Sequence, residues 1–294
     1  MSKSIEVTGL INGQLYGFRM FPRNLKGQYQ TETDGATATA TPQEFAIPTY
    51  TGNHSIFGNE TEGRIEMYTS GTLTLYPSFY DVYAVGGGGA GEGKAGDYSG
   101  NGGGSGYTAK SSKIINEVKE LAITIGSGAM SMTGNGGDTT IMDTSSNITW
   151  ISAKGGYGGS RGADGTIFSG GDGGSGGGGG AYQVKAGDGG SDGSDGGRSG
   201  QVASKGGKGQ GTTTRDFGEV TGTLRAGGGG AGGSGSNQRI GLGGAGGGGN
   251  GFYVDQTLNQ IYGTPNTGGG GGGSFTTTAG AGGSGIAIIR WKRN

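Results

Sequence analysis

The stretch YDVYAVGGGG, residues 80–89, joins the two kinds of structure that the rest of the chain repeats. Its first six residues combine β-branched and aromatic side chains, a composition that favours a β-strand. The strand passes directly into four glycines, which have no side chain to bury. Glycine-rich tracts bounded by predicted strands recur at residues 86–106, 126–137, 154–205, 226–251 and 263–285. Each tract is therefore expected to be a closed excursion whose two ends are held in a sheet.

Short apolar runs with turn residues on either side predict further strands. Residues 72–76 (TLTLY) alternate with period two and lie between the turn residues Ser70-Gly71 and Pro77-Ser78. Strands are predicted near residues 65–68, 72–76, 80–85, 121–125, 139–142, 148–153 and 285–291. Residues 109–121 leave a short helix open as an alternative, because Ile114, Val118 and Leu121 have helical spacing.

Glycine content limits what the tracts can form. The chain has 80 glycines in 294 residues, and 71 of them lie between residues 86 and 285. Collagen is excluded, because the chain has only 5 prolines and no glycine at every third position. Apolar residues make up 29% of the chain, too few for a large aliphatic core along its whole length. Something other than aliphatic packing must hold the tracts together.

Left-handed polyglycine helices are one structure that such tracts can adopt. They have three residues per turn, rise about 3.1 Å per residue and make no internal hydrogen bonds. Their amide and carbonyl groups point outward and must pair with neighbouring helices, which only glycine lets approach closely. Ordering each residue costs roughly 1–2 kcal/mol, so such a bundle forms only when nearly every group is paired. A disordered linker is the alternative, but the flanking strands and sparse charges favour order.

The sequence therefore predicts a mainly β fold. We expect a β-sandwich whose inserted glycine-rich tracts pack as a bundle of polyglycine II helices, preceded by a small β module. The predicted boundaries place an attachment module at residues 1–45 and the sandwich with its bundle at residues 46–294. Within the first module, residues 28–42 are polar and are interpreted as an extended edge or a linker.

Charge and residue types argue against several functional classes. Lys and Arg total 21 against 22 for Asp and Glu, with no basic run, so no nucleic-acid surface is expected. The chain has no cysteine and one histidine, His54, which argues against disulfides, a zinc site and a histidine-dependent triad. No apolar run is long enough to span a membrane, and no signal-peptide core is present, so a soluble protein without membrane insertion is expected.

Three short patterns suggest chemistry but are better explained without it. Matches to G-x-G-x-x-G are expected by chance at this glycine content and accompany no βαβ unit. Residues 188–196 (DGGSDGSDG) lack the spacing of an EF-hand loop and are interpreted as solvated turns, with weak cation binding left open. Glu60 and Glu62 are interpreted as exposed carboxylates rather than a glycosidase pair. No catalytic, cofactor-binding or metal-binding residue is predicted.

Several segments together resemble the glycine-rich domain of phage and prophage tail proteins, in the order in which that family has them. These segments are residues 68–73 (YTSGTL), 80–89, 122–128 (AITIGSG), 209–219 (GQGTTTRDFGE), 226–230 (AGGGG) and 282–290 (GGSGIAIIR). Residues 17–28 are similar to a short module at the start of such proteins. The domain also resembles the polyglycine-helix sandwich of tail-fibre tip adhesins.

The resemblance implies a non-enzymatic receptor-binding protein of a phage or phage-like tail. It would assemble in the host cytoplasm, join the virion tail at a fibre or baseplate through residues 1–45, and bind a host-surface glycan or protein. The oligomeric state is left open, a homotrimer included. The alternatives are a purely structural cap or spacer in a tail fibre or baseplate, and a tail depolymerase.

Aromatic residues within the glycine tracts are the candidate receptor contacts, because tyrosine combines contact area with a hydroxyl group. The tract at residues 155–170 (GGYGGSRGADGTIFSG) has the most varied side chains and is the favoured recognition loop. The predicted receptor-binding residues are Tyr157, Arg161, Phe168, Tyr98, Tyr182 and Tyr253. The alternative for each of these aromatic residues is a spacer or cap over the bundle.

Overall fold

The chain divides into two compact units, residues 1–46 and residues 47–294. The computed structural model describes residues 7, 10, 14–20, 36–40, 46–93, 99–161, 168–180, 191–193, 209–210, 214–233, 240–253 and 260–293. In the first unit, β1 (Tyr16–Met20) pairs antiparallel with β2 (Ala36–Ala40). The stretch interpreted as an edge or linker therefore supplies one of the two strands. Over the described residues, no helix is long and apolar enough to cross a membrane.

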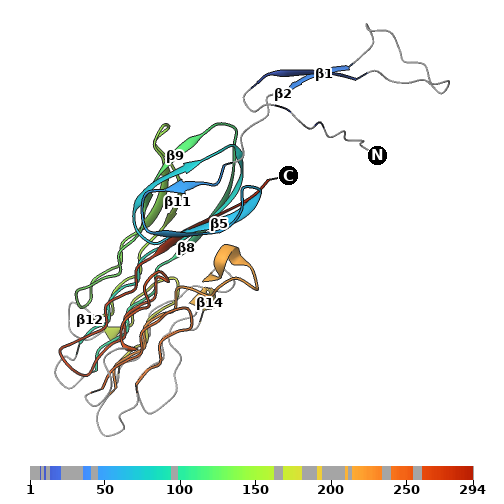
Figure 1. Ribbon diagram of the computed structural model, residues 1–294. Helices are drawn as coiled ribbons and strands as arrows, with labels where there is room; N and C mark the ends of the chain where they lie inside the picture. Colours follow the sequence, from blue (N-terminus) through green and yellow to red (C-terminus); the bar gives the residue numbers. More distant parts are fainter. Residues whose placement is uncertain are drawn as a thin grey trace. The chain divides into compact units, whose positions relative to one another are not determined.

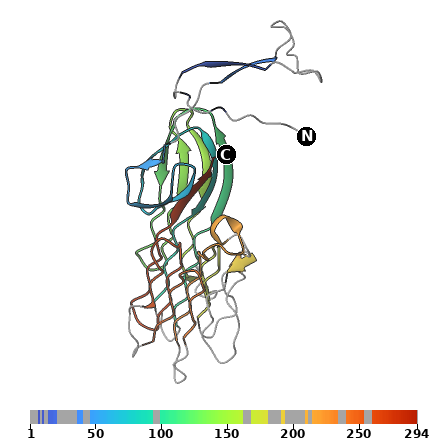
Figure 2. The same ribbon diagram turned by 45° about the vertical axis from the view of Figure 1, so that its right-hand side comes forward.

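Two five-stranded antiparallel sheets form the sandwich of the second unit (Figures 1 and 2). The first sheet has the order β11 (Ile148–Ala153), β10 (Thr139–Asp143), β9 (Lys119–Thr124), β6 (Gly71–Leu75), β3 (Thr49–Tyr50). The second has the order β4 (His54–Gly58), β5 (Glu62–Met67), β16 (Ile286–Lys292), β7 (Ser78–Val85), β8 (Thr108–Ile115). The mainly β sandwich predicted from the sequence is confirmed.

Short elements complete the described structure within the glycine-rich half of the chain. They are the antiparallel pair β12 (Ser160–Arg161) and β13 (Phe168–Ser169), the pair β14 (Ser191–Gly193) and β15 (Gly209–Gln210), and the 3-10 turn η3 (Asp216–Gly218).

The segment left open between helix and strand is a strand, a turn and a second strand. Residues 108–115 form β8 beside β7, and residues 119–124 form β9 beside β6, so one segment connects the two sheets. The helical spacing of Ile114 and Val118 predicts that both side chains share a buried face, but both side chains are exposed. Ile115 and Leu121 enter the core instead.

The core lies between the sheets, but β7 and β16 bury both of their faces over part of their length. Val82 and Ile289 point into the main core between the sheets. Their neighbours Tyr83 and Ile288 point the other way, into a second cluster that Phe217 covers. Part of the outer face of the second sheet is therefore covered by residues 214–225, which we call the cap. Continuous apolar sequence in both strands is explained by this double burial.

The glycine-rich tracts form a bundle that extends from one end of the sandwich (Figure 2). The first tract, residues 86–92, donates its successive amides to three different neighbours in rotation, at 2.8–3.0 Å. Residues 86, 89 and 92 donate to segment 101–107, residues 87 and 90 to segment 134–137, and residues 88 and 91 to segment 280–283. A repeat of three residues is that of a threefold helix, in contrast to the twofold repeat of a strand.

Carbonyl groups of the same tract follow the same rotation toward three further neighbours. They accept from residues 156 and 159, from residues 129 and 133, and from residues 271 and 274. The helix at residues 86–92 thus has six hydrogen-bonded neighbours. Residues 99–107 and 268–274 are likewise surrounded on all sides, and all three helices are buried. The predicted polyglycine bundle is present in the described tracts.

Glycine is required in these helices because neighbouring backbones touch where a side chain would be. A Cβ built on Gly103 or on Gly270 would overlap a carbonyl oxygen of an adjacent helix. Where a larger residue occurs, its side chain takes the place of a backbone group. The Asn101 side-chain Oδ1 accepts from the Gly180 backbone amide at 2.8 Å, and its side-chain Nδ2 donates to the carboxylate of buried Glu92 at 2.6 Å.

Candidate functional site

Two of the six predicted receptor-binding residues, Tyr98 and Tyr182, lie outside the described residues. Arg161 and Phe168 lie directly opposite each other in the pair of β12 and β13, so the backbone brings these two together. Tyr157 is half exposed, and Tyr253 is partly buried against the Phe275 ring, with 5.4 Å between ring centroids.

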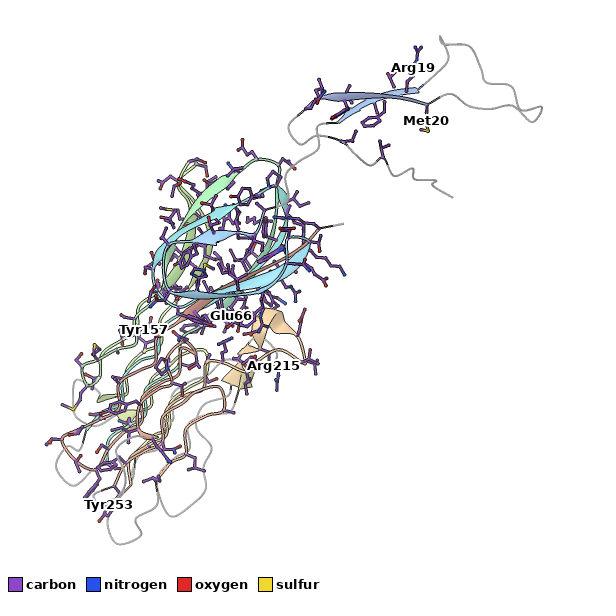
Figure 3. The ribbon with its side chains drawn as sticks, in the orientation of Figure 1. Arg19, Met20, Glu66, Tyr157, Arg215 and Tyr253 are labelled. Carbon is purple, nitrogen blue, oxygen red and sulfur yellow. The ribbon has the colours of Figure 1, made fainter. Side chains whose placement is uncertain are left out.

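Tyr157 and Tyr253 lie toward opposite ends of the bundle (Figure 3). The Tyr157 carbonyl accepts from Gly104, which lies only about one helical turn from β8 and the sandwich. Tyr253 follows Phe252, whose amide donates to Gly273, about 15 Å along its helix from Gly268. The structure does not bring these two predicted residues into one site.

The end of the bundle away from the sandwich, which we call the tip, carries exposed side chains on its turns. In the turn at residues 130–133, Met130 is 92% exposed and Met132 is also exposed. The Met132 sulfur and the backbone of Thr276 both lie beside Gly93, so this turn and the turn at residues 275–279 are neighbours. Aromatic content, on which the sequence-based prediction rests, does not identify these methionines.

A second concave site lies on the outer face of the second sheet, next to the cap. This groove has a volume of about 880 Å³. Its floor comes from β4, β5, β7 and β16, and one wall comes from residues 216–223 of the cap. Exposed aromatic and charged residues line it, among them Phe57, Phe79, Arg64, Arg290 and Glu219.

Arg290 connects the sheet to the cap. Its Nε donates to Asp81 at 2.9 Å, and its Nη1 donates to Glu219 of the cap at 2.6 Å. The guanidinium also lies over the Phe217 ring, 4.2 Å from the centroid. Burial opposes the charge of Arg290, but Glu219 and Asp81 more than offset it and raise the pKa of this arginine.

A buried ion pair fixes the cap internally. Arg225 donates to Asp216 from Nε at 2.6 Å and from Nη2 at 3.1 Å, and its Nη1 donates to the Asn266 carbonyl at 3.0 Å. Both side chains of the pair are buried. Burial alone would lower the pKa of Arg225, but hydrogen bonds and the charge of Asp216 raise it. The bidentate geometry therefore keeps Arg225 charged despite its burial.

Two charged residues within apolar strands are a sequence signal for the groove. Asp81 and Arg290 each place a charge within an otherwise apolar strand, YDVYAV and IAIIRW. Charges are rarely placed in buried strands unless they are paired, so these two could have been matched with each other. The sequence around Glu219 does not indicate that it pairs with Arg290, because this ion pair depends on how the cap lies on the sheet.

The residues assigned to non-chemical roles lie at the surface. His54 is exposed, and its Nδ1 lies 2.7 Å from the Gly52 carbonyl oxygen. Glu60 and Glu62 are exposed around the turn between β4 and β5. Of residues 188–196, only 191–193 are described, so the solvated-turn interpretation lies mostly outside the described residues. Among the residues with described positions, no cluster of His, Asp or Glu could hold a metal ion.

Comparison with known proteins adds one finding. A search of curated proteins gave no match. A family model described as a glycine-rich domain matches residues 68–292, from the end of β5 to the end of β16. The match thus includes the bundle, the cap and seven of the ten strands of the sandwich. The chain belongs to this family of glycine-rich domains.

Proposed function

We propose that this chain is a receptor-binding protein of a phage or phage-like tail that presents the tip of its bundle to the host cell surface. The observation that carries the proposal is the six-neighbour packing of the polyglycine helices. Because of this packing, the helices cannot shift independently, and each described turn at the tip is held at both ends by such helices. Preorganised turns lose little conformational entropy when they bind, which favours adhesion.

Exposed side chains at the tip supply contact area for a partner. Met130 and Met132 are flexible and adapt to varied surfaces. The neighbouring turn at residues 275–279 adds threonine hydroxyls, and Phe275 packs against Tyr253. A host-surface glycan or protein is the proposed partner, and binding without catalysis is the proposed activity.

The first unit is proposed to attach the chain to the virion tail after assembly in the host cytoplasm. A two-stranded ribbon is marginally stable by itself. Leu15 is 69% exposed and Met20 is also exposed at the two ends of β1. A docking partner in a tail fibre or baseplate, with or without trimerisation of this chain, would cover these apolar side chains.

Separate measurements of particle incorporation and cell binding test the proposal. Replacing Met130, Met132 and Tyr253 with serine should leave incorporation unchanged and reduce adsorption to host cells at least tenfold. A matched variant replaces exposed Ile148 and Val118 of the sandwich with serine and should adsorb normally. Normal adsorption by particles that lack this protein would overturn the proposal.

The second candidate function is that the whole chain is a purely structural cap or spacer of a tail fibre or baseplate, without receptor binding. The same dense backbone packing favours this function. A spacer needs the length and stiffness of the bundle but no particular side chain on it. Replacing Tyr157, Arg161 and Phe168 together with alanine, and in a second variant the three tip residues, tests this candidate. A spacer keeps full infectivity in both variants, whereas a receptor-binding protein loses it in at least one.

A further inference from the structure

The groove beside the cap contains a row of side chains that crosses four strands. Phe57 of β4 lies opposite Arg64 of β5, Arg64 lies opposite Arg290 of β16, and Arg290 lies opposite Asp81 of β7. Residues directly opposite one another in an antiparallel sheet share a face. The row therefore forms a continuous floor on the outer face of the second sheet, where the cap ends.

Two aromatic side chains of this floor are open to solvent. Phe57 is 47% exposed and Phe79 is 44% exposed, and both line the groove. Alternate residues of these strands pack in the main core on the opposite side of the sheet, so the two phenylalanines are placed on the solvent-facing side. Phenylalanine has no polar atom that would explain its exposure, and exposed aromatic rings in a concave site offer flat contact area to a ligand.

Charged groups of both signs surround these rings, and several of them are held in place by ion pairs. Arg64 pairs with Glu66 at 3.1 Å and lies 4.9 Å from the centroid of the Phe57 ring. Arg290 is fixed by Asp81 and Glu219, as described above. Glu62 and Lys292 complete the lining, and Asp216 is neutralised by Arg225. With the pair partners Glu66 and Arg225 included, four cations face five anions, so the groove offers both hydrogen-bond donors and acceptors with a small excess of negative charge.

Backbone strain is located in the same wall. Phe217 has φ 57° and is followed by Gly218 with φ 72°. Such a conformation is uncommon for an aromatic residue and persists only where surrounding structure imposes it. Here the Phe217 ring packs between Tyr83 and Arg290, and the neighbouring Asp216 is held by Arg225. Strained residues held in this way cluster at ligand sites, which is a second indication of binding.

We propose that this groove binds a neutral carbohydrate, a pyranose unit of a host-surface or solution glycan. The flat C–H face of a pyranose ring would lie on Phe57 or Phe79, and its hydroxyls would accept from the guanidinium groups and donate to the carboxylates. An acidic sugar would meet Glu62, Asp81 and Glu219. An apolar peptide would desolvate the charged groups without offering them any new hydrogen bond. The proposal does not rest on the tip binding a receptor.

Affinity electrophoresis of the full chain in gels that contain soluble neutral polysaccharides tests this site. The probes are a glucan, a galactan and a mannan, with a polyuronate as the acidic comparison. We expect at least one neutral polysaccharide to retard the protein. The variant with Phe57→Ala and Phe79→Ala should raise its dissociation constant about tenfold or more. The control variant, Ile148→Ala with Val118→Ala, removes exposed apolar side chains outside the groove and should keep full retardation.

Thermal unfolding of each variant separates loss of binding from loss of folding, because exposed side chains contribute little to the core. The result that overturns the proposal is no retardation by any neutral polysaccharide, retardation by the polyuronate alone, or equal retardation of the groove and control variants. The tip variant distinguishes this site from the proposed function. It should lose cell adsorption but keep retardation, whereas the groove variant should lose retardation.

Discussion

Gly270 shows how little space a single residue has in the bundle. A Cβ at this position would overlap the Gly103 carbonyl oxygen and lie 2.9 Å from the Gly229 amide nitrogen, and both contacts are backbone. Because rigid backbones cannot move aside separately, Gly270→Ala should destabilise the second unit by about 3 kcal/mol or more. Denaturant unfolding followed by circular dichroism measures the change.

Gly137→Ala is the matched control for Gly270→Ala. A Cβ at Gly137 meets its nearest atom, the Ser127 amide nitrogen, at 3.2 Å. We expect a change in the free energy of unfolding well below that of Gly270→Ala. Equal effects of the two substitutions would show that close helix packing does not determine the requirement for glycine.

Asp216 and Arg225 should show strong coupling. Removing one partner leaves a buried charge unpaired, so Asp216→Ala should lower the free energy of unfolding by about 3–5 kcal/mol. Adding Arg225→Met removes that charge, so the double variant should be more stable than Asp216→Ala alone. A double-mutant cycle by denaturant unfolding measures the coupling. Additive single effects would contradict the pairing.

Tyr50 should make the sandwich sensitive to alkali. Burial raises the pKa of its hydroxyl from 10.0 to about 12, and this hydroxyl donates to the Thr69 carbonyl. Below pH 10 both folded and unfolded states keep the proton. Between pH 10 and 12 only the unfolded state releases it, so the free energy of unfolding falls as pH rises.

Melting temperatures between pH 9 and pH 12 measure the contribution of Tyr50. The wild-type melting temperature should fall more steeply with pH than that of Tyr50→Phe, which cannot release this proton. Tyr262→Phe, at an exposed tyrosine, is the control and should follow the wild type. Parallel curves for wild type and Tyr50→Phe would exclude the proposed origin of the sensitivity.

At the scale of elements, strands were predictable from the sequence and their partners only in part. The seven predicted strands correspond to β5, β6, β7, β9, β10, β11 and β16. The sequence did not predict β4 or β8, because their exposed residues do not alternate cleanly between apolar and polar. Edge strands bury less surface, so composition constrains them less.

The bundle shows a different limit of sequence analysis. Glycine density predicts threefold helices, since little else can use so many residues without side chains. It does not predict which helix lies beside which, because glycines are chemically identical and every pairing offers the same hydrogen bonds. The strands at the tract ends resolve this ambiguity. Candidate receptor residues were harder to predict for the same reason, since a position on the bundle surface depends on the arrangement of helices.

At the scale of the whole molecule, the last strand closes the structure. Strand β16 lies in the middle of the second sheet, between β5 and β7, although some 200 residues separate it from β7 in the sequence. Deleting residues 286–294 would expose both neighbouring strands and release the final polyglycine helix. We expect loss of amide protection in the described helices between residues 86 and 285, including residues 86–92, and not only near the C-terminus, measured by hydrogen exchange.

Deleting residues 1–46 is the matched control for the C-terminal deletion. These residues form the other compact unit, so the second unit should keep its protection pattern and its melting temperature. If instead the C-terminal deletion left residues 86–107 protected, the bundle would not depend on closure of the sheet.

The rotation of hydrogen bonds in the helix at residues 86–92 also restricts which length changes the chain can accept. Inserting one residue into such a helix would turn every later amide by 120°. Each amide would then point to a different neighbouring helix, whose carbonyl oxygen is not level with it along the helix axis. Three inserted residues would restore the direction of each amide. Viable insertions and deletions within the helices of related chains should therefore occur in multiples of three, while the connecting turns should vary in length without this constraint.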